Sequence, residues 1–94
     1  MTRYRLTKRA ANDFEAIFDD GIDQFGLEQA REYQRGLSAK FSEIAEHPMR
    51  FPAIDEVLEG HRRSVFRSHS IYYRHSDDAI VIIRVLGRQQ FEID

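Results

Sequence analysis

Arginine provides most of the side chains in this sequence that could do chemistry. Twelve of the 14 basic residues are arginine, and Arg62, Arg63, Arg67 and Arg74 fall, with three histidines, in a segment (61–76) that has no acidic residue. A guanidinium group is planar and binds carboxylate or phosphate through paired hydrogen bonds. We therefore expect this segment to contact anionic groups of a partner.

Arg84 is the most informative of the arginines because it interrupts an apolar run, 79–86. Burying a guanidinium group is costly unless its charge is paired or faces a polar cleft. We predict either an internal ion pair with an acidic group such as Glu92 or Asp77, or an anion-binding role. In the second case Arg84 would bind an anionic group of a target molecule together with Arg62, Arg67 and Arg88. We call these four residues the candidate target-binding residues.

Other kinds of reactive site have little support in the sequence. His61, His69 and His75 have no cysteine or paired acid beside them, which favours surface histidines over a metal site. There is no Gly-rich phosphate loop and no Ser-His-Asp arrangement. The acidic residues of the first predicted helix fall between its apolar positions, which indicates a solvated face. We expect neither a metal nor a cofactor.

The positions of these side chains depend on four predicted strands. Residues 79–86 are dense in isoleucine and valine and apolar on both faces, which predicts a central strand. Residues 70–75 precede it and are joined to it by a turn at 76–78, which indicates a hairpin. Residues 62–67 have few apolar members and many charges, which is typical of an edge strand. A short fourth strand is expected at 3–6.

Two amphipathic helices are expected between the first strand and the other three. Thr7 is a suitable N-cap for the first, and Gly26 follows its last apolar residue. The second should end at His47, because a residue that precedes proline disfavours the helical conformation. We predict an αα-hairpin with a connection of about two residues near Gly26. Apolar residues recur at helical spacing in both: in the first helix they are Ala10, Ala11, Phe14, Ile17, Phe18, Ile22 and Phe25, and in the second Ala30, Tyr33, Leu37, Phe41, Ile44 and Ala45.

Together these elements predict one α+β domain, residues 1–94, with the order β-α-α-β-β-β. The helical hairpin should pack on one face of a small, mainly antiparallel sheet. Strict alternation along the last strand places under the helices Ala79, Val81, Ile83 and Val85. The other face would then carry Ile80, Ile82 and Leu86 beside the arginines. Either a partner covers this face, or the loop 48–60 and the tail 91–94 fold over it.

Composition narrows the class of protein further. The chain of 94 residues has 14 basic and 16 acidic side chains, so bulk positive charge does not indicate a sequence-independent nucleic-acid binder. It has no cysteine, which excludes disulfides and thiolate chemistry. No apolar run is long enough for a signal sequence or a membrane span. We therefore expect a cytoplasmic protein that does not bind a membrane.

The succession of motifs along the chain is more specific than any one of them. It runs Tyr4-x-Leu6-Thr7, a helix with Ala11, Asp13 and Ile17, Gly26, a helix with Ala30 and Leu37, His47-Pro48, Gly60-x-Arg62, His69-x-Ile71-x-Tyr73-Arg74 and Ile82-Ile83-Arg84-Val85-Leu86. This succession resembles the RelE/ParE superfamily of toxins, on its ParE branch, over essentially the whole chain.

The resemblance implies the toxin of a type II toxin–antitoxin pair, neutralised by the C-terminal segment of a cognate ParD-like antitoxin. ParE-like members act on DNA gyrase, so the implied activity is inhibition of replication without catalysis by the toxin itself. DNA would be contacted only indirectly, through the antitoxin complex. We expect the antitoxin to present an amphipathic helix. Its apolar residues would contact Phe18, Phe25 and Tyr33.

Two functions other than gyrase inhibition are compatible with the same fold. RelE-like members cut mRNA on the ribosome, with lysines and arginines on central strands and a tyrosine or histidine near the C-terminus. Here no lysine follows Arg50, and the segment 87–91 has neither tyrosine nor histidine, which favours the gyrase inhibitor. ParE-like members commonly have a histidine where this chain has Gly87. A partner-binding module of the same fold that has lost toxicity is the second alternative.

Overall fold

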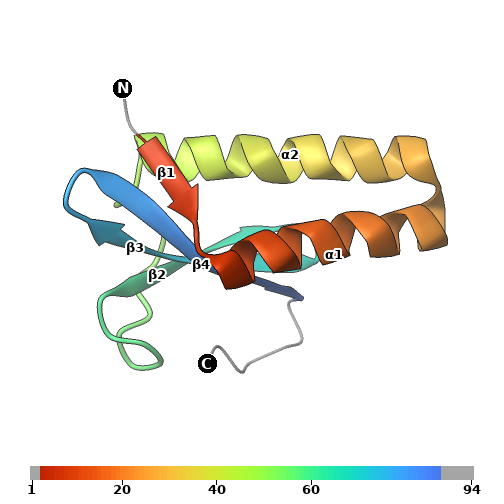
Figure 1. Cartoon of the computed structure of the whole chain (residues 1–94). Coiled ribbons are helices and arrows are strands. Elements are labelled where there is room, and N and C mark those ends of the chain that lie inside the picture. Colours follow the sequence, from red (N-terminus) through yellow and green to blue (C-terminus); the bar gives the residue numbers. More distant parts are fainter. Residues whose placement is uncertain (1–2, 88–94) are drawn as a thin grey trace.

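A computed structural model of the chain describes residues 3–87, which form two helices and four strands (Figure 1). In chain order the elements are β1 (Arg3–Leu6), α1 (Lys8–Phe25), α2 (Leu27–Glu46), β2 (His61–Phe66), β3 (His69–Ser76) and β4 (Ala79–Gly87). The predicted α+β order β-α-α-β-β-β is confirmed.

The four strands form one mixed sheet in the order β1-β4-β3-β2. The last three strands are antiparallel to one another, while β1 pairs in parallel with β4. A parallel pair requires a crossover connection, and here the chain passes from β1 through the helical hairpin, β2 and β3 before it reaches β4. The prediction of a central β4 and an edge strand β2 is confirmed.

The helical hairpin is joined by a single residue. Thr7 caps α1, because its side-chain oxygen accepts a hydrogen bond from the amide of Ala10 at 3.1 Å. Gly26 ends α1 and begins α2, so the connection is shorter than the two residues expected. Its φ of 93° lies in a region that glycine enters without steric cost. A larger residue at this position would strain the turn.

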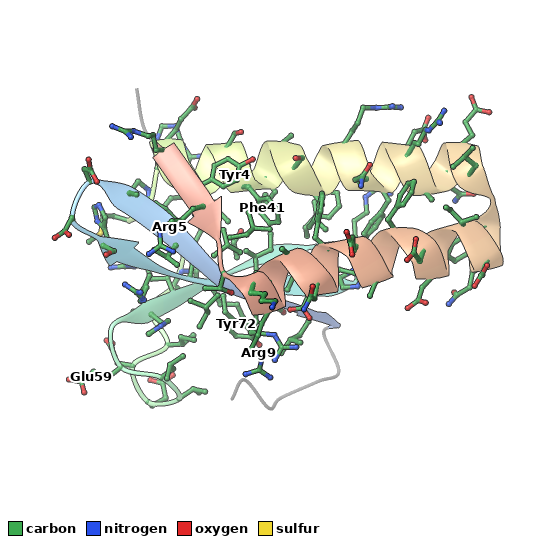
Figure 2. The ribbon with its side chains drawn as sticks, in the orientation of Figure 1. Tyr4, Arg5, Arg9, Phe41, Glu59 and Tyr72 are labelled. Atoms are coloured by element: carbon green, nitrogen blue, oxygen red, sulfur yellow. The ribbon has the colours of Figure 1, made fainter. Side chains whose placement is uncertain are left out.

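The main core lies between the helical hairpin and one face of the sheet (Figure 2). Tyr4 on β1 points toward Phe41 on α2, and the ring centroids are 5.6 Å apart in an edge-to-face arrangement. Removing this apolar surface from water provides most of the driving force for folding. The buried members of the core are Ala10, Leu37, Phe41, Ile44, Ala45, Ile71, Tyr73, Ile80, Ile82 and Val85.

The prediction of which face of β4 packs under the helices is wrong for most of the strand. Ile80 and Ile82 lie in the core beneath the helices, whereas Ile83 packs on the opposite face. The physical reason is a β-bulge: Tyr72 pairs with Arg84 and Tyr73 with Ile82, so Ile83 is an extra residue on β4. The bulge shifts the alternation by one residue, and only the part beyond it follows the predicted pattern.

The loop 48–60 packs on part of the second face of the sheet, so the part of this alternative that concerns the loop is confirmed. Its residues Ile54 and Leu58 pack against a cluster of Tyr72, Ile83 and Leu86. The loop is also bonded to β2 through the Ile54 amide and the His61 carbonyl (2.9 Å) and through the Arg63 amide and the Pro52 carbonyl (3.1 Å). The tail 91–94 lies outside the described residues.

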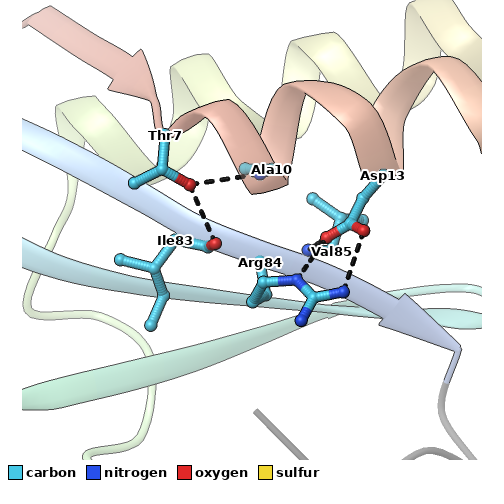
Figure 3. Close-up of polar contacts among 6 residues, drawn as sticks. All are labelled: Thr7, Ala10, Asp13, Ile83, Arg84 and Val85. Carbon is cyan, nitrogen blue, oxygen red and sulfur yellow. Dashed lines mark hydrogen bonds and ion pairs between the residues drawn. The ribbon is translucent and has the colours of Figure 1, made fainter. Parts of the chain in front are cut away.

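The Asp13 carboxylate joins α1 to β4 (Figure 3). It accepts two hydrogen bonds from the Arg84 guanidinium, at 2.7 and 3.0 Å, and a third from the Val85 amide at 2.9 Å. Only 15% of each side chain is exposed. The expected solvated position of this acid is therefore wrong, because Asp13 pairs with Arg84. Asp77, one of the two acids expected to pair with Arg84, lies in an exposed turn, and Glu92 lies outside the described residues. Sequence spacing missed the pair because 71 positions separate its members.

Replacing Asp13 with alanine should strongly destabilise the fold. The substitution leaves a nearly buried guanidinium and a strand amide without their acceptor, and breaking such a pair costs about 3 kcal/mol. Asp19→Ala is the matched control, because it removes the same charge from an exposed position on the same helix. Its free energy of unfolding, measured by urea denaturation, should stay within about 0.5 kcal/mol of wild type. Equal stability of the two variants would contradict the role of Asp13.

Candidate functional site

An open groove lies between the helical hairpin and the turn that joins β2 to β3. The connected ends of α1 and α2 project beyond the sheet (Figure 1), and the turn 67–68 lies on the strand side of this groove. Its volume is about 430 Å³, enough for several side chains of a partner. The lining residues are Ile17, Asp20, Gly21, Gln24, Phe25, Gln29, Ala30, Tyr33, Arg67, Ser68 and His69.

A hydrogen bond between Tyr33 and His69 forms the polar centre of this groove. The Tyr33 hydroxyl lies 2.7 Å from Nδ1 of His69, and the two rings pack edge to face with centroids 5.5 Å apart. When Nδ1 carries no proton it accepts from the hydroxyl. The same hydroxyl lies 3.4 Å from the Phe66 carbonyl oxygen, an acceptor it could use instead. The pair therefore connects α2 directly to the start of β3.

Phe66 determines how closely α2 approaches the sheet at this point. Its ring lies 5.1 Å from the Tyr33 ring, and a Cβ atom added to Gly36 would lie only 2.6 Å from the Phe66 ring. Glycine in a helix interior costs about 1 kcal/mol relative to alanine. At position 36 the absence of a side chain gives the space that the ring of Phe66 occupies.

Burial determines the electrostatics of the Tyr33 and His69 pair. Desolvation lowers the pKa of His69 below its ordinary value, although the nearby negative charge of Asp13 partly opposes the shift. Desolvation also raises the pKa of Tyr33, while a backbone hydrogen bond and the charge of Arg67 act in the opposite direction. Both shifts favour the neutral side chains. The groove thus offers a neutral donor and acceptor pair beside apolar side chains, which suits an amphipathic partner segment.

The four predicted target-binding arginines do not form one cluster. Arg62 donates from Nη1 to the Phe51 carbonyl at 2.7 Å and so helps hold the loop 48–60. Arg67 lies at the other end of β2, in the turn and exposed, with its guanidinium 5.6 Å from the ring centroid of Phe66. Arg84 is engaged by Asp13. Arg88 lies outside the described residues.

The three predicted antitoxin-binding residues differ in position. Phe25 is 62% exposed and lines the groove together with Tyr33. Phe18 is half-buried on α1 and does not line it. The groove therefore brings together two of these residues, and it adds Arg67 from the predicted target-binding set.

The prediction that His69 is a surface histidine is wrong, and this residue of the groove has no clear signal in the sequence. It is half-buried and paired with a residue 36 positions away. Its only sequence signal is its place immediately before the predicted strand 70–75. Within residues 3–87, no group of three or more potential ligands could hold a metal ion. None of the described helices has the length and apolar character needed to cross a membrane.

The burial of His69 should make stability depend on pH. Because its pKa is lowered in the folded state from the ordinary 6.5, the unfolded chain binds a proton at higher pH than the folded chain. The stabilising contribution is complete above the unfolded pKa and is lost as the pH falls below it. From about pH 7 to pH 5, the unfolding free energy of wild type should fall more than that of His69→Asn. His75→Asn, at an exposed position, should follow wild type, whereas parallel curves for wild type and His69→Asn would contradict the expectation.

Comparison with curated proteins and solved structures identifies relatives along the whole chain. Toxin ParE1 of Caulobacter vibrioides is 38% identical over 86 residues, which cover 92% of this chain and 88% of that protein. Toxin ParE1 of Mycobacterium tuberculosis is 32% identical over 94 residues, covering 99% and 95% of the two chains. A solved structure of the chromosomal ParDE toxin–antitoxin system from P. aeruginosa superposes on this chain with a TM-score of 0.81 at 20% sequence identity. The superposition covers 93% of this chain and 96% of the other. This last similarity supports the fold.

The family match covers the elements that build the groove and the ion pair. Residues 4–90 match the family described as "ParE toxin of type II toxin-antitoxin system, parDE". This span includes both helices, all four strands except the first residue of β1, and every residue that lines the groove. The chain therefore belongs to the ParE family of toxins of type II toxin–antitoxin systems.

Proposed function

We propose that this toxin inhibits DNA gyrase in the cytoplasm and is neutralised there by a cognate ParD-like antitoxin. The observation that carries the proposal is the match to ParE toxins along residues 4–90. Inhibition of this kind requires a surface that binds gyrase and no catalytic group on the toxin.

Tyrosine and arginine side chains on the central strands make contacts within the fold, which supports a non-catalytic toxin over a ribonuclease. Metal-free RNA cleavage requires accessible groups for proton transfer and cations at the phosphate. On β3 the Tyr73 hydroxyl donates to the Pro48 carbonyl at 2.7 Å, and burial raises its pKa. Tyr72 is buried beneath the loop 48–60, and Arg84 is bound to Asp13. These groups contribute to the fold in ways that would compete with catalysis.

Arg67 is the best-exposed of the described candidates for the gyrase contact. It lies in the β2–β3 turn with a positive φ of 51°. This residue is part of the tight turn at the tip of the hairpin formed by β2 and β3. From this position its guanidinium group can reach a partner. In this proposal Arg67 acts with Arg62, Arg84 and Arg88, and Arg62 and Arg84 also hold the fold.

Replacing Arg67 with alanine should weaken gyrase inhibition. Interface arginines are often hot spots, so the concentration for half-inhibition of supercoiling should rise about tenfold. The assay titrates the toxin into gyrase and relaxed plasmid. Arg31→Ala, which removes an exposed arginine from α2, is the matched control and should inhibit like wild type. The turn conformation is unaffected, since alanine and arginine present the same Cβ atom.

A parallel translation reaction separates the alternatives. Loss of supercoiling with intact mRNA supports the gyrase inhibitor. Cuts at codon spacing with normal supercoiling would instead indicate a RelE-like ribonuclease. If neither assay responds and expression without antitoxin leaves growth unchanged, the chain is a partner-binding module that has lost toxicity.

For the antitoxin, we propose docking of an amphipathic helix in the groove. Phe25 offers an exposed aromatic surface, and Tyr33 with His69 offers a neutral polar pair for a hydrogen bond from the partner. Phe18 extends the apolar surface along α1. The groove is also lined by Asp20, Gln24, Gln29 and Arg67, which can pair with polar residues of such a helix while its apolar face contacts Ile17 and Phe25.

Phe25→Ala should weaken the complex with the cognate antitoxin. Loss of a central aromatic anchor typically costs about 2 kcal/mol, or roughly a thirtyfold increase in Kd. Isothermal titration calorimetry measures the change directly. Leu27→Ala is the matched control, because Leu27 is also an exposed apolar residue of the hairpin end but does not line the groove. Equal effects of the two substitutions would argue against the groove as the docking site.

A further inference from the structure

The sheet face turned away from the helices carries a row of arginines that the proposed function does not use. Tyr4 and Tyr73 pack in the core beneath the helices, so the next residues, Arg5 and Arg74, point to the opposite face. Both pair in register with Val81, which places them on β1 and β3 at either side of β4. Two strand spacings put their backbones about 10 Å apart.

Two further arginines extend this row. Arg3 lies on the same face as Arg5, about 7 Å along the strand. It is 3.9 Å from Asp78, in an exposed ion pair of little energetic weight. Figure 2 shows Arg9 reaching from the first turn of α1 toward the side of the sheet on which Tyr72 lies. The row therefore comprises arginines of two strands, β1 and β3, on either side of β4, and one arginine of α1.

These guanidinium groups are available to a partner. Within residues 3–87, the side chains of Arg5, Arg9 and Arg74 make no hydrogen bond or ion pair. The loop 48–60, which packs on this face at Tyr72, carries Asp55, Glu56 and Glu59, and Asp78 pairs with Arg3. Within residues 3–87, none of these acids forms an ion pair with Arg5, Arg9 or Arg74.

The surroundings of the arginines favour a phosphate backbone over a protein partner. Val81, between Arg5 and Arg74, is 0% exposed, and the neighbouring Tyr72 is 5% exposed. A protein interface needs an accessible apolar anchor, and single-stranded nucleic acid needs accessible aromatic rings for stacking. This face offers neither of these beside the arginines. Charge alone remains, and a duplex presents regularly spaced phosphates to it.

We propose that this face, with Arg5, Arg9 and Arg74, binds the phosphodiester backbone of duplex DNA. The interaction is direct and independent of base sequence, and it goes beyond the proposed inhibition of gyrase. A toxin with such a face can hold DNA while its other surfaces contact proteins.

The test is fluorescence anisotropy of a labelled duplex of about 20 base pairs, a usual length for a protein-binding site, at increasing salt. The purified toxin is used without gyrase or antitoxin, so the outcome is independent of the proposed function. Each phosphate contact contributes about 0.9 to the slope of log K against log salt. The double variant Arg5→Ala/Arg74→Ala should reduce the slope by about 2.

The controls separate a specific face from general charge. Arg31→Ala/Arg35→Ala removes the same charge from exposed positions of α2 and should leave the slope unchanged. Arg5→Lys/Arg74→Lys keeps both charges and should keep the wild-type slope. This result would demonstrate that substitution at these two positions does not by itself abolish folding or binding.

Three results would overturn the proposal. One is an equal loss of slope in both alanine variants. Another is tighter binding of a single strand of the same length. The third is binding of a polyglutamate peptide without binding of the duplex, which would indicate an acidic protein partner.

Discussion

The arrangement of this fold depends on the contact between Asp13 and the edge of β4. β1 is only four residues long and pairs with β4 no further than Ile82. Beyond that point α1 supplies the missing partners, because Thr7 binds the carbonyls of Ile82 and Ile83 and Asp13 binds the amide of Val85. The Arg84 guanidinium neutralises the carboxylate at the same place. One short segment of α1 thus satisfies the exposed strand edge and neutralises a nearly buried charge.

This contact also shapes the groove. Because α1 is held to β4 near its N-terminus, its other half projects past the sheet with α2 (Figure 1). The projecting helices form one wall of the groove, and the β2–β3 turn forms the other. The hydrogen bond between Tyr33 and His69 joins the two walls, and the charge of Asp13 acts on His69. The ion pair and the groove are therefore electrostatically linked.

The groove and the arginine row have different chemistry and lie on different sides of the sheet. The groove combines an exposed aromatic ring with a neutral polar pair, whereas the row offers cations without an accessible apolar anchor. An amphipathic helix suits the first, and a polyanion suits the second. A small domain can in this way bind two partners without overlap, since each surface is built from separate side chains.

The sequence alone was sufficient for the element order, the central β4, the edge β2 and the hairpin of helices. Each of these follows from local periodicity, capping residues and turn residues, which act between near neighbours. Tertiary structure decided the rest. The bulge at Ile83 depends on pairing with β3, so alternation along β4 alone assigned the wrong face to Ile80 and Ile82. The pairs Asp13 with Arg84 and Tyr33 with His69 join residues 71 and 36 positions apart, and no local pattern encodes a contact that exists only once the chain has packed.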